Sequence, residues 1–296
     1  MSTFSERSCW AIYRELAHSP GRETDDALIL RATAARLEAL GYTVELKTAE
    51  EVIESNVEPP PYLFVMCERL PILARLEEWE KRGSCMVNRG PAIRNTYRDK
   101  TVLLFEKFHV PFPASVMVPT SLPIPPEAEF RESPAGCWVK RGDVHATESQ
   151  DVVFAANPLA LGQALKALLA RGIEKALIQE HVAGDLIKYY GVGEVDPQAE
   201  SETGGGWFQW FYHRGQELKN YRFDERELAA AVSRAATALG LEVFGGDAIA
   251  TKDGRIIIID LNAWPSFALY RDVASGHIAS YLAERFRRHA EVEVQE

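Results

Sequence analysis

Cysteine is scarce in this chain of 296 residues, and the four that occur are scattered, at Cys9, Cys67, Cys85 and Cys137. No C-x-x-C pair is present, so the cysteine spacing predicts neither a zinc site nor a disulfide framework. The seven histidines are also dispersed, without an H-x-x-x-H motif, which argues against a zinc hydrolase. A reducing cytoplasm is the simplest setting for such a composition.

Long apolar runs and an excess of basic residues are lacking too. No apolar stretch approaches the roughly 18 residues of a membrane span, and the opening MSTFSERSCW is unlike a signal peptide. Lys and Arg number 33 against 43 Asp and Glu, for a formal net charge of -10, which argues against an extended nucleic-acid surface. We therefore expect a cytoplasmic protein with neither a membrane nor a nucleic-acid partner.

The first ninety-odd residues alternate strand-like and helix-like segments, which favours a small open α/β sheet. Strands are predicted at 9–16, 42–46, 61–67 and 85–88, and helices at 24–41 and 71–83. Ligands gather at the carboxyl ends of strands in such sheets. The loop residues there are the candidates for substrate binding: His18, Ser19, Arg22, Glu68, Arg69, Asn88 and Arg89.

A long helix is predicted at 92–110, before a proline-rich connection at 111–127 that flanks a short strand. Because proline cannot continue helices or central strands, the domain boundary is predicted near residues 95–125. The rest of the chain mixes strands and helices, and the polar, glycine-rich segment 197–206 is expected to form a loop that orders over a bound ligand. Further strands are predicted at 136–142, 175–182, 186–195, 207–215, 244–254 and 255–262, and helices at 158–172, 224–240 and 276–289.

The last two predicted strands carry the best local signal for chemistry. They are separated by TKDG, whose Asp-Gly favours a tight antiparallel turn. Asp260 and Asn262 end the second strand on one face, because side chains two apart on a strand point the same way, and Asp247 is expected across from them. Such an oxygen-rich group suits magnesium. The alternative is that the two aspartates only cap turns.

Five segments in order resemble the ATP-grasp superfamily, from about Arg94 to the C-terminus. They are Lys140, LIQEHV at 177–182, Lys188 in IKYYGVGE, FGGDAIA at 244–250 and IIIIDLNAWPSF at 256–267. The resemblance implies an α/β (α+β grasp) fold. An N-terminal open α/β substrate subdomain (1–95) would precede a small grasp subdomain (96–183) and a large one with the metal site (184–296).

The resemblance also implies roles for charged residues. Asp247, Asp260 and Asn262 match the family's ligands for magnesium, or manganese, bound to ATP. Lys140 matches the lysine that contacts the α- and β-phosphates, and Lys100 an earlier nucleotide-contacting lysine. Without the resemblance, Lys100 would be an ordinary solvated lysine of a charged helix.

The stretch before Lys188 matches the family's hinge, where backbone groups read adenine and a carboxylate accepts a ribose hydroxyl. Asp185 is a second candidate for ribose, and Lys188 for phosphate or substrate. The matching hinge residues are Gln179, Glu180, His181 and Val182.

The activity that the resemblance implies is ATP-dependent ligation. A carboxylate of a small molecule or peptide becomes an acyl phosphate, which an amine attacks. Positioning and charge neutralisation dominate such catalysis, with Lys140, Lys188 and Arg222 as candidates. The loop that would face the second substrate starts at Pro265-Ser266.

Two other functions stay open. The same segments resemble the inositol polyphosphate kinase branch, which phosphorylates a hydroxyl, although Ser266 stands where that branch has Gly. A nucleotide-binding module without activity would lack a metal ligand, and all three candidates are present. Relatives commonly dimerise, so a homodimer is a further expectation.

Overall fold

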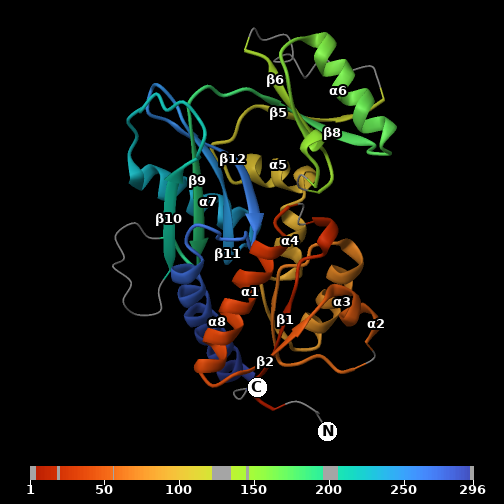
Figure 1. The fold of residues 1–296 in the computed structure, drawn as a ribbon, viewed down its shortest axis with the longest axis vertical. Helices are drawn as coiled ribbons and strands as arrows, with labels where there is room; N and C mark the ends of the chain where they lie inside the picture. Colours follow the sequence, from red (N-terminus) through yellow and green to blue (C-terminus); the bar gives the residue numbers. More distant parts are fainter. Residues whose placement is uncertain are drawn as a thin grey trace.

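The computed structural model describes residues 5–18, 21–55, 57–121, 135–144, 147–195 and 206–293. Within these ranges the strands form three four-stranded sheets, which we call the N-terminal, middle and C-terminal sheets (Figure 1). Ser19 lies outside the described residues, as does the segment 197–206 except for Gly206. No helix of the described ranges is long and apolar enough to cross a membrane.

The N-terminal sheet is parallel, with the order β2-β1-β3-β4, which confirms the predicted open α/β sheet. Its inner strands are apolar runs with both faces covered, as parallel sheets require. A short helix that the sequence analysis missed, α2, begins at a capping box between Thr48 and Glu51. The elements are β1 (Ser8–Ile12), a 3-10 turn (Leu16–His18), α1 (Glu23–Ala39), β2 (Thr43–Lys47), α2 (Ala49–Glu54), β3 (Tyr62–Val65), α3 (Leu70–Lys81) and β4 (Cys85–Val87).

The predicted single helix at 92–110 is wrong, because two helices occupy this region: α4 (Gly90–Asn95) and α5 (Arg98–Lys107). Tyr97 is extended and separates them, with φ -65° and ψ 131°. The break changes the direction of the chain, so Arg98 enters the interior and is only 7% exposed.

The middle sheet is antiparallel, with the order β5-β8-β6-β7, and helix α6 covers one face (Figure 1). Leucines and alanines spaced three and four residues apart on α6 form the core with this sheet. Strand β7 was not predicted. The elements are β5 (Ser115–Pro119), β6 (Cys137–Arg141), a 3-10 turn (Ser149–Asp151), β7 (Val152–Ala155), α6 (Pro158–Ala170) and β8 (Lys175–Glu180).

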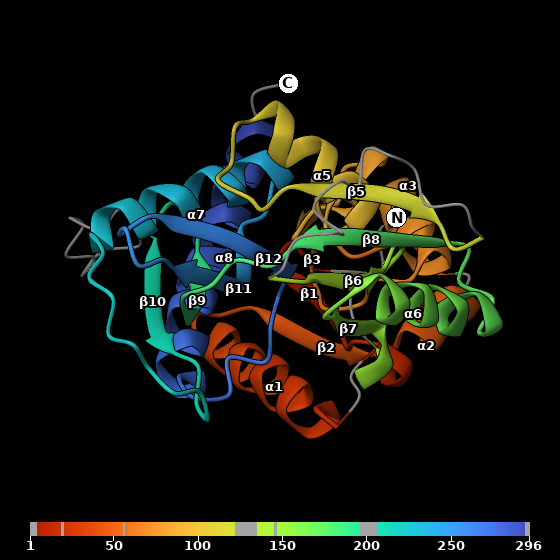
Figure 2. The same cartoon turned by 90° about the horizontal axis from the view of Figure 1, so that it is seen from above.

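The C-terminal sheet is antiparallel, with the order β10-β9-β11-β12. Seen from above, it lies with α7 on one side of the molecule, and the middle sheet with α6 lies on the other (Figure 2). Helix α7 buries a face of alanine, leucine and valine and ends at Gly240 in the left-handed conformation. The elements are β9 (Asp185–Val192), β10 (Trp207–Tyr212), α7 (Glu225–Leu239), β11 (Val243–Ala250), β12 (Ile256–Ala263) and α8 (Arg271–Glu293).

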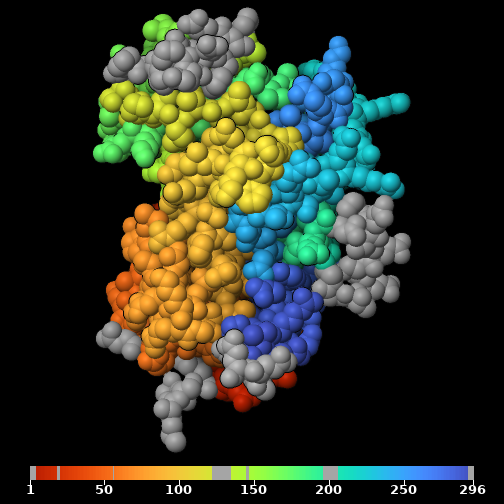
Figure 3. Space-filling model, turned by 180° about the vertical axis from the view of Figure 1, so that it is seen from behind, coloured from red at the N-terminus to blue at the C-terminus, as the bar shows by residue number. Residues whose placement is uncertain are grey.

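Helix α8 returns to the N-terminal sheet, and the two ends of the chain share one core. The Arg36 guanidinium of α1 donates to Ser275 Oγ of α8 at 2.9 Å, and the rings of Tyr62 and Phe286 stack at 4.5 Å. From behind, the dark blue surface of α8 adjoins the orange N-terminal part (Figure 3). These contacts hold the N-terminal sheet against the C-terminal sheet. The predicted subdomain limits, at 95/96 and 183/184, stay predictions.

Candidate active site

A cavity of about 600 Å³ lies between the start of α1, the C-terminal sheet and the loop that follows β12. Residues far apart in the sequence line it together. Seven of the predicted site residues are among them: His18, Arg22, Lys188, Asp247, Asp260, Asn262 and Ser266.

Strand register sets the floor of this cavity. Phe211, Lys188, Asp247 and Asp260 pair in one row across β10, β9, β11 and β12. Side chains opposite one another share a face, so a single row carries an aromatic ring, an ammonium group and two carboxylates. The antiparallel hairpin predicted around TKDG, with Asp247 across from Asp260, is confirmed.

A β-bulge interrupts the hairpin beside the acid pair. Asp247 pairs with Asp260, but Ala248 pairs with Ile258, so Ile259 is an extra residue of β12. The carbonyl of this extra residue, Ile259, accepts a hydrogen bond from Lys140 Nζ at 3.2 Å. The bulge thus brings a lysine of the middle sheet to the acid pair of the C-terminal sheet.

The charged groups of the row have polar partners within the cavity. Lys188 Nζ lies 2.6 Å from Asp247 Oδ1, and Asn262 Nδ2 donates to Asp260 Oδ2 at 2.9 Å. Burial raises the pKa of Asp247, the ammonium of Lys188 lowers it, and the charge of Asp260 raises it. The two adjacent carboxylates repel each other in this site, so an additional cation would stabilise them.

Lys140 is the most perturbed cation of the site. Its side chain is buried, which lowers its pKa to about 8, while the Asp260 carboxylate opposes this shift. A buried ammonium with a lowered pKa gains most from an anion that enters the site. Phosphate is such an anion.

Arg98 is a second buried cation here that the sequence analysis missed. Its Nη1 donates to the carbonyls of Arg141 and Val144 at 3.0 and 2.8 Å, which holds the loop after β6. Burial lowers the pKa of Arg98, while Asp260 and then Asp151 raise it. No local pattern marks it in the sequence, because its burial follows from the helix break at Tyr97.

Two glycines before Asp247 keep the row accessible. A Cβ on Gly246 would meet the Asp260 carbonyl oxygen at 2.1 Å and the Tyr189 hydroxyl at 2.6 Å. A Cβ on Gly245 would meet Pro265 at 2.6 Å. Any larger residue would therefore displace the acid pair or the loop after β12.

The donor set suits magnesium. Asp247, Asp260 and Asn262 offer carboxylate and amide oxygens, which hard cations prefer, and magnesium is commonly held by one or two carboxylates together with substrate phosphates. In the described part of the chain, no three His, Cys, Asp or Glu side chains gather as a metal site. Coordination by these three residues would thus be completed by a phosphate ligand and water.

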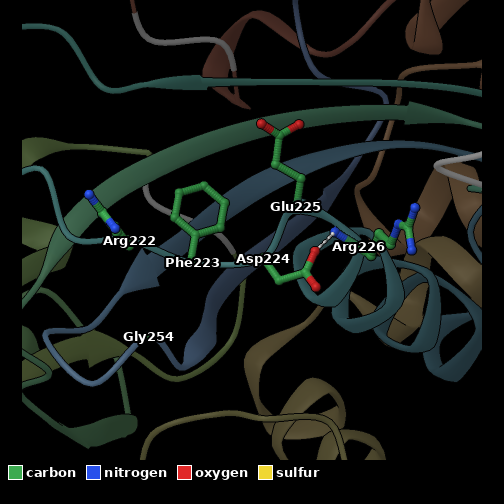
Figure 4. Close-up of a pocket in the computed structure, with 6 residues that line it drawn as sticks. All are labelled: Arg222, Phe223, Asp224, Glu225, Arg226 and Gly254. Carbon is green, nitrogen blue, oxygen red and sulfur yellow. Dashed lines mark hydrogen bonds between the residues drawn. The ribbon is translucent and has the colours of Figure 1, made fainter.

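Arg222 is not brought to the acid pair. It lines a different cavity, beside the turn that joins β11 to β12, with Phe223, Asp224 and Gly254 (Figure 4). Its catalytic role stays a prediction, and the buried arginine that interacts with the Asp260 charge is Arg98.

Several other predicted residues also lie outside the cavity. The Arg89 guanidinium pairs with Glu80 at 2.9 Å, and Asn88 binds the backbone of Glu242 and Val243. Lys100 is exposed on α5, and Arg69 is exposed just before α3. Glu68 is buried and pairs at 2.5 Å with Arg14, which lines the cavity.

The hinge residues lie at the end of β8, where the middle sheet leads into β9. Gln179 is buried and donates to Ser115 Oγ at 3.1 Å, while Glu180 is exposed. His181 Nδ1 accepts from the Trp138 indole at 3.2 Å, and Val182 follows it, partly exposed. Glu180 is thus the carboxylate here that a ligand can reach.

The carboxylate of Asp185 binds backbone groups of the protein itself. It is 1% exposed, and its two carboxylate oxygens accept the backbone N–H groups of Lys219 and Tyr221 at 2.7 and 2.9 Å. These bonds fix the loop before α7, so we do not place Asp185 in the nucleotide site.

Solved structures with a similar fold match nearly the whole chain. The ATP-grasp ligase PsnB, complexed with precursor peptide PsnA2 and AMPPNP, has 15% identity and a TM-score of 0.63 over 97% of this chain and 99% of its own. The D-alanine–D-alanine ligase from Bacillus anthracis, complexed with ATP, has 11% identity and a TM-score of 0.69 over 98% and 99%. D-cycloserine synthetase DcsG has 16% identity and a TM-score of 0.65 over 94% and 99%. The chain has the ATP-grasp fold.

The ATP-grasp fold was therefore predicted correctly from five short segments. No protein-family model matches the sequence, and a search of curated proteins gave no match. Further residues that line the cavity were not predicted for the site. They come from the loop after β1, the start of α1, β9, β10 with the residues that follow it, and the loop after β12. Those with charged or large side chains are Arg14, Asp25, Asp26, Tyr190, Phe211, His213, Arg214 and Leu269.

Proposed function

We propose that the protein is an ATP- and magnesium-dependent ligase, which activates a carboxylate of a small molecule or peptide as an acyl phosphate for attack by an amine. The observation that carries the proposal is the row of Lys188, Asp247 and Asp260, with Lys140 bound at the bulge beside it. Two carboxylates among buried and half-buried cations form a site for a metal ion and phosphate groups.

The solved structures support ATP as the nucleotide and ligation as the reaction. The compared ligases include structures complexed with AMPPNP, with ATP and, for a second PsnB structure, with Mg and ADP. Because these neighbours are ligases, we propose ligation rather than phosphorylation of a hydroxyl. PsnB is also complexed with a precursor peptide, which supports a peptide as one kind of substrate for this protein.

We assign the residues as follows. Asp247, Asp260 and Asn262 would hold magnesium, which neutralises charge on the transferred phosphoryl group when bound. Lys140, which lies on the middle sheet, would bind a phosphate group. Lys188 would leave Asp247 and pair with the anionic ligand.

The reaction balances without a side-chain nucleophile. A substrate carboxylate oxygen takes the γ-phosphoryl group of ATP and ADP leaves. The amine nitrogen then attacks the carbonyl carbon, phosphate leaves and the amine loses a proton to water. The contribution of the protein is positioning and charge stabilisation.

Analysis of the products by phosphorus NMR tests the proposal. With ATP, magnesium and pairs of amino acids or dipeptides as probes, we expect ADP and free phosphate to form in equal amounts with an amide product. Phosphate that stays on the acceptor would identify a kinase and contradict the proposal.

A further inference from the structure

The lining of the cavity combines two kinds of surface. Besides the acid pair and the cations, it includes an apolar side, formed by Tyr190, Phe211, Pro265, Ala268 and Leu269. The Leu269 side chain is 45% exposed and Phe211 is half-buried. Apolar surface left open in a cavity is normally covered by a ligand.

The apolar side is also rigid. The ring of Phe211 lies 5.4 Å from that of Tyr190 and 5.5 Å from that of Tyr270, and Tyr190 packs on Phe267 at 4.8 Å. Such a cluster of rings holds Phe211 in one orientation against the cavity. The surface is therefore preformed, which lowers the entropic cost of binding.

Strand register gives the distance between Phe211 and the acid pair. Phe211 and Asp247 are in one row and are separated by strand β9, so two strand spacings of roughly 4.8 Å, about 10 Å in all, divide them. A ligand that reacts over the acid pair can reach Phe211 only with a side group of that length.

Two arginines that line the cavity, Arg22 and Arg214, point to an anionic ligand. Arg22 donates to Ser266 Oγ at 3.5 Å, and within the described ranges neither Arg22 nor Arg214 forms an ion pair with a carboxylate. Both line the cavity. A carboxylated ligand would supply the negative charge that these guanidinium groups lack.

We propose that Phe211 and Leu269 form a specificity subsite for an apolar or aromatic group of the substrate, about 10 Å from the acid pair across the row of the C-terminal sheet. The substrate class is a carboxylic acid that carries such a group, either a small molecule or the side chain of a peptide. This inference rests on the proposed function, because the acid pair defines where the reacting carboxylate lies.

Binding of simple carboxylates tests the subsite without any need for turnover. The probes are pentanoate, phenylacetate and 5-phenylpentanoate, titrated by calorimetry into the full chain with magnesium and AMPPNP. We expect 5-phenylpentanoate to bind at least tenfold more tightly than pentanoate, and phenylacetate to gain less, because its ring cannot reach Phe211 from the acid pair.

Two variants separate the subsite from general packing. Phe211→Ala should lose at least fivefold in affinity for 5-phenylpentanoate and leave pentanoate unchanged. Phe208→Ala, on the opposite face of the same strand, is the matched control and should keep the gain. Leu269→Ala, in an exposed loop position, repeats the test if Phe211→Ala does not fold.

The outcomes are distinct from those for the proposed function. A phenyl ring that adds no affinity in the wild-type protein, or equal losses in the Phe211 and Phe208 variants, would overturn the subsite. Failure of AMPPNP to bind the wild-type protein would instead overturn the proposed function.

Discussion

Lys188 and Asp247 are neighbours across β9 and β11, and the ammonium nitrogen lies 2.6 Å from a carboxylate oxygen. Their side chains are 29% and 24% exposed, so the pair faces the cavity rather than the core. A magnesium ion on Asp247 would compete with Lys188 for that oxygen. Metal binding and movement of Lys188 are therefore expected to be linked.

The first prediction concerns the acid pair itself. Asp247→Asn and Asp260→Asn should each lower magnesium-dependent ATP turnover about 100-fold or more, because metal ligation contributes several kcal/mol to stabilising transition-state charge. Burial raises the pKa of Asp247, so its ionised form is a cost to folding, and Asp247→Asn should not lower the melting temperature. Asp272→Asn is the control, since that side chain is 99% exposed. Retention of full turnover in either variant would refute the assignment.

The second prediction follows from the pKa of Lys140, which burial lowers to about 8. Nucleotide phosphates favour the protonated form, so binding takes up a proton once the pH exceeds this pKa. The Kd for AMPPNP should be flat below about pH 8 and then rise, approaching tenfold per pH unit. Lys140→Arg should abolish the rise, because guanidinium stays charged in this range.

Calorimetric titrations from about pH 7 to about pH 9.5 measure this dependence. Lys100→Met, at an exposed position on α5, should keep the wild-type profile. The same rise in the Lys140→Arg variant would assign the titration to another group.

The third prediction concerns the glycine beside the acid pair. Gly246→Ala should destabilise the protein by about 1 to 3 kcal/mol, since its Cβ would overlap the Asp260 carbonyl oxygen. Turnover should fall in the folded fraction as well. Gly162→Ala is the matched control: it lies within α6, a Cβ there meets nothing within 4 Å, and it should stabilise by about 0.5 to 1 kcal/mol. Denaturant unfolding measures both, and an unchanged midpoint for Gly246→Ala would contradict the geometry.

The fourth prediction separates two carboxylates near the hinge. Glu180 is exposed, whereas both oxygens of Asp185 bind backbone N–H groups. Glu180→Ala should therefore weaken ATP binding while leaving 2′,3′-dideoxy-ATP unaffected. Asp185→Asn should keep the preference for ATP over the dideoxy nucleotide but lower stability by about 1 to 3 kcal/mol, through lost backbone hydrogen bonds. Loss of the preference for ATP in the Asp185→Asn variant, with the preference kept in Glu180→Ala, would assign the ribose contact to Asp185.

Much of the C-terminal hairpin could be predicted because its signals are local. An Asp-Gly turn fixes the pairing of two strands, and two-residue alternation puts Asp260 and Asn262 on one face, with Leu261 buried on the other. The order of segments then led from this hairpin to the ATP-grasp fold.

Features that depend on tertiary structure could not be read in the same way. The bulge at Ile259 and the helix break at Tyr97 are shifts of one or two residues, yet they decide that Lys140 and Arg98 meet near Asp260. Arg222 looked suitable by residue type alone, but the loop before α7 carries it to another cavity. Register, rather than composition, also placed Phe211 in the row.

Trapping with hydroxylamine tests the central claim most directly, because hydroxylamine converts an acyl phosphate to a stable hydroxamate. With ATP, magnesium and 5-phenylpentanoate or a dipeptide as the carboxylate, we predict hydroxamate, ADP and phosphate in equal amounts from the wild-type protein. The Asp260→Asn variant should form none of them above background. ADP formation without hydroxamate, or with the phosphate retained on the acceptor, would contradict carboxylate activation at this site.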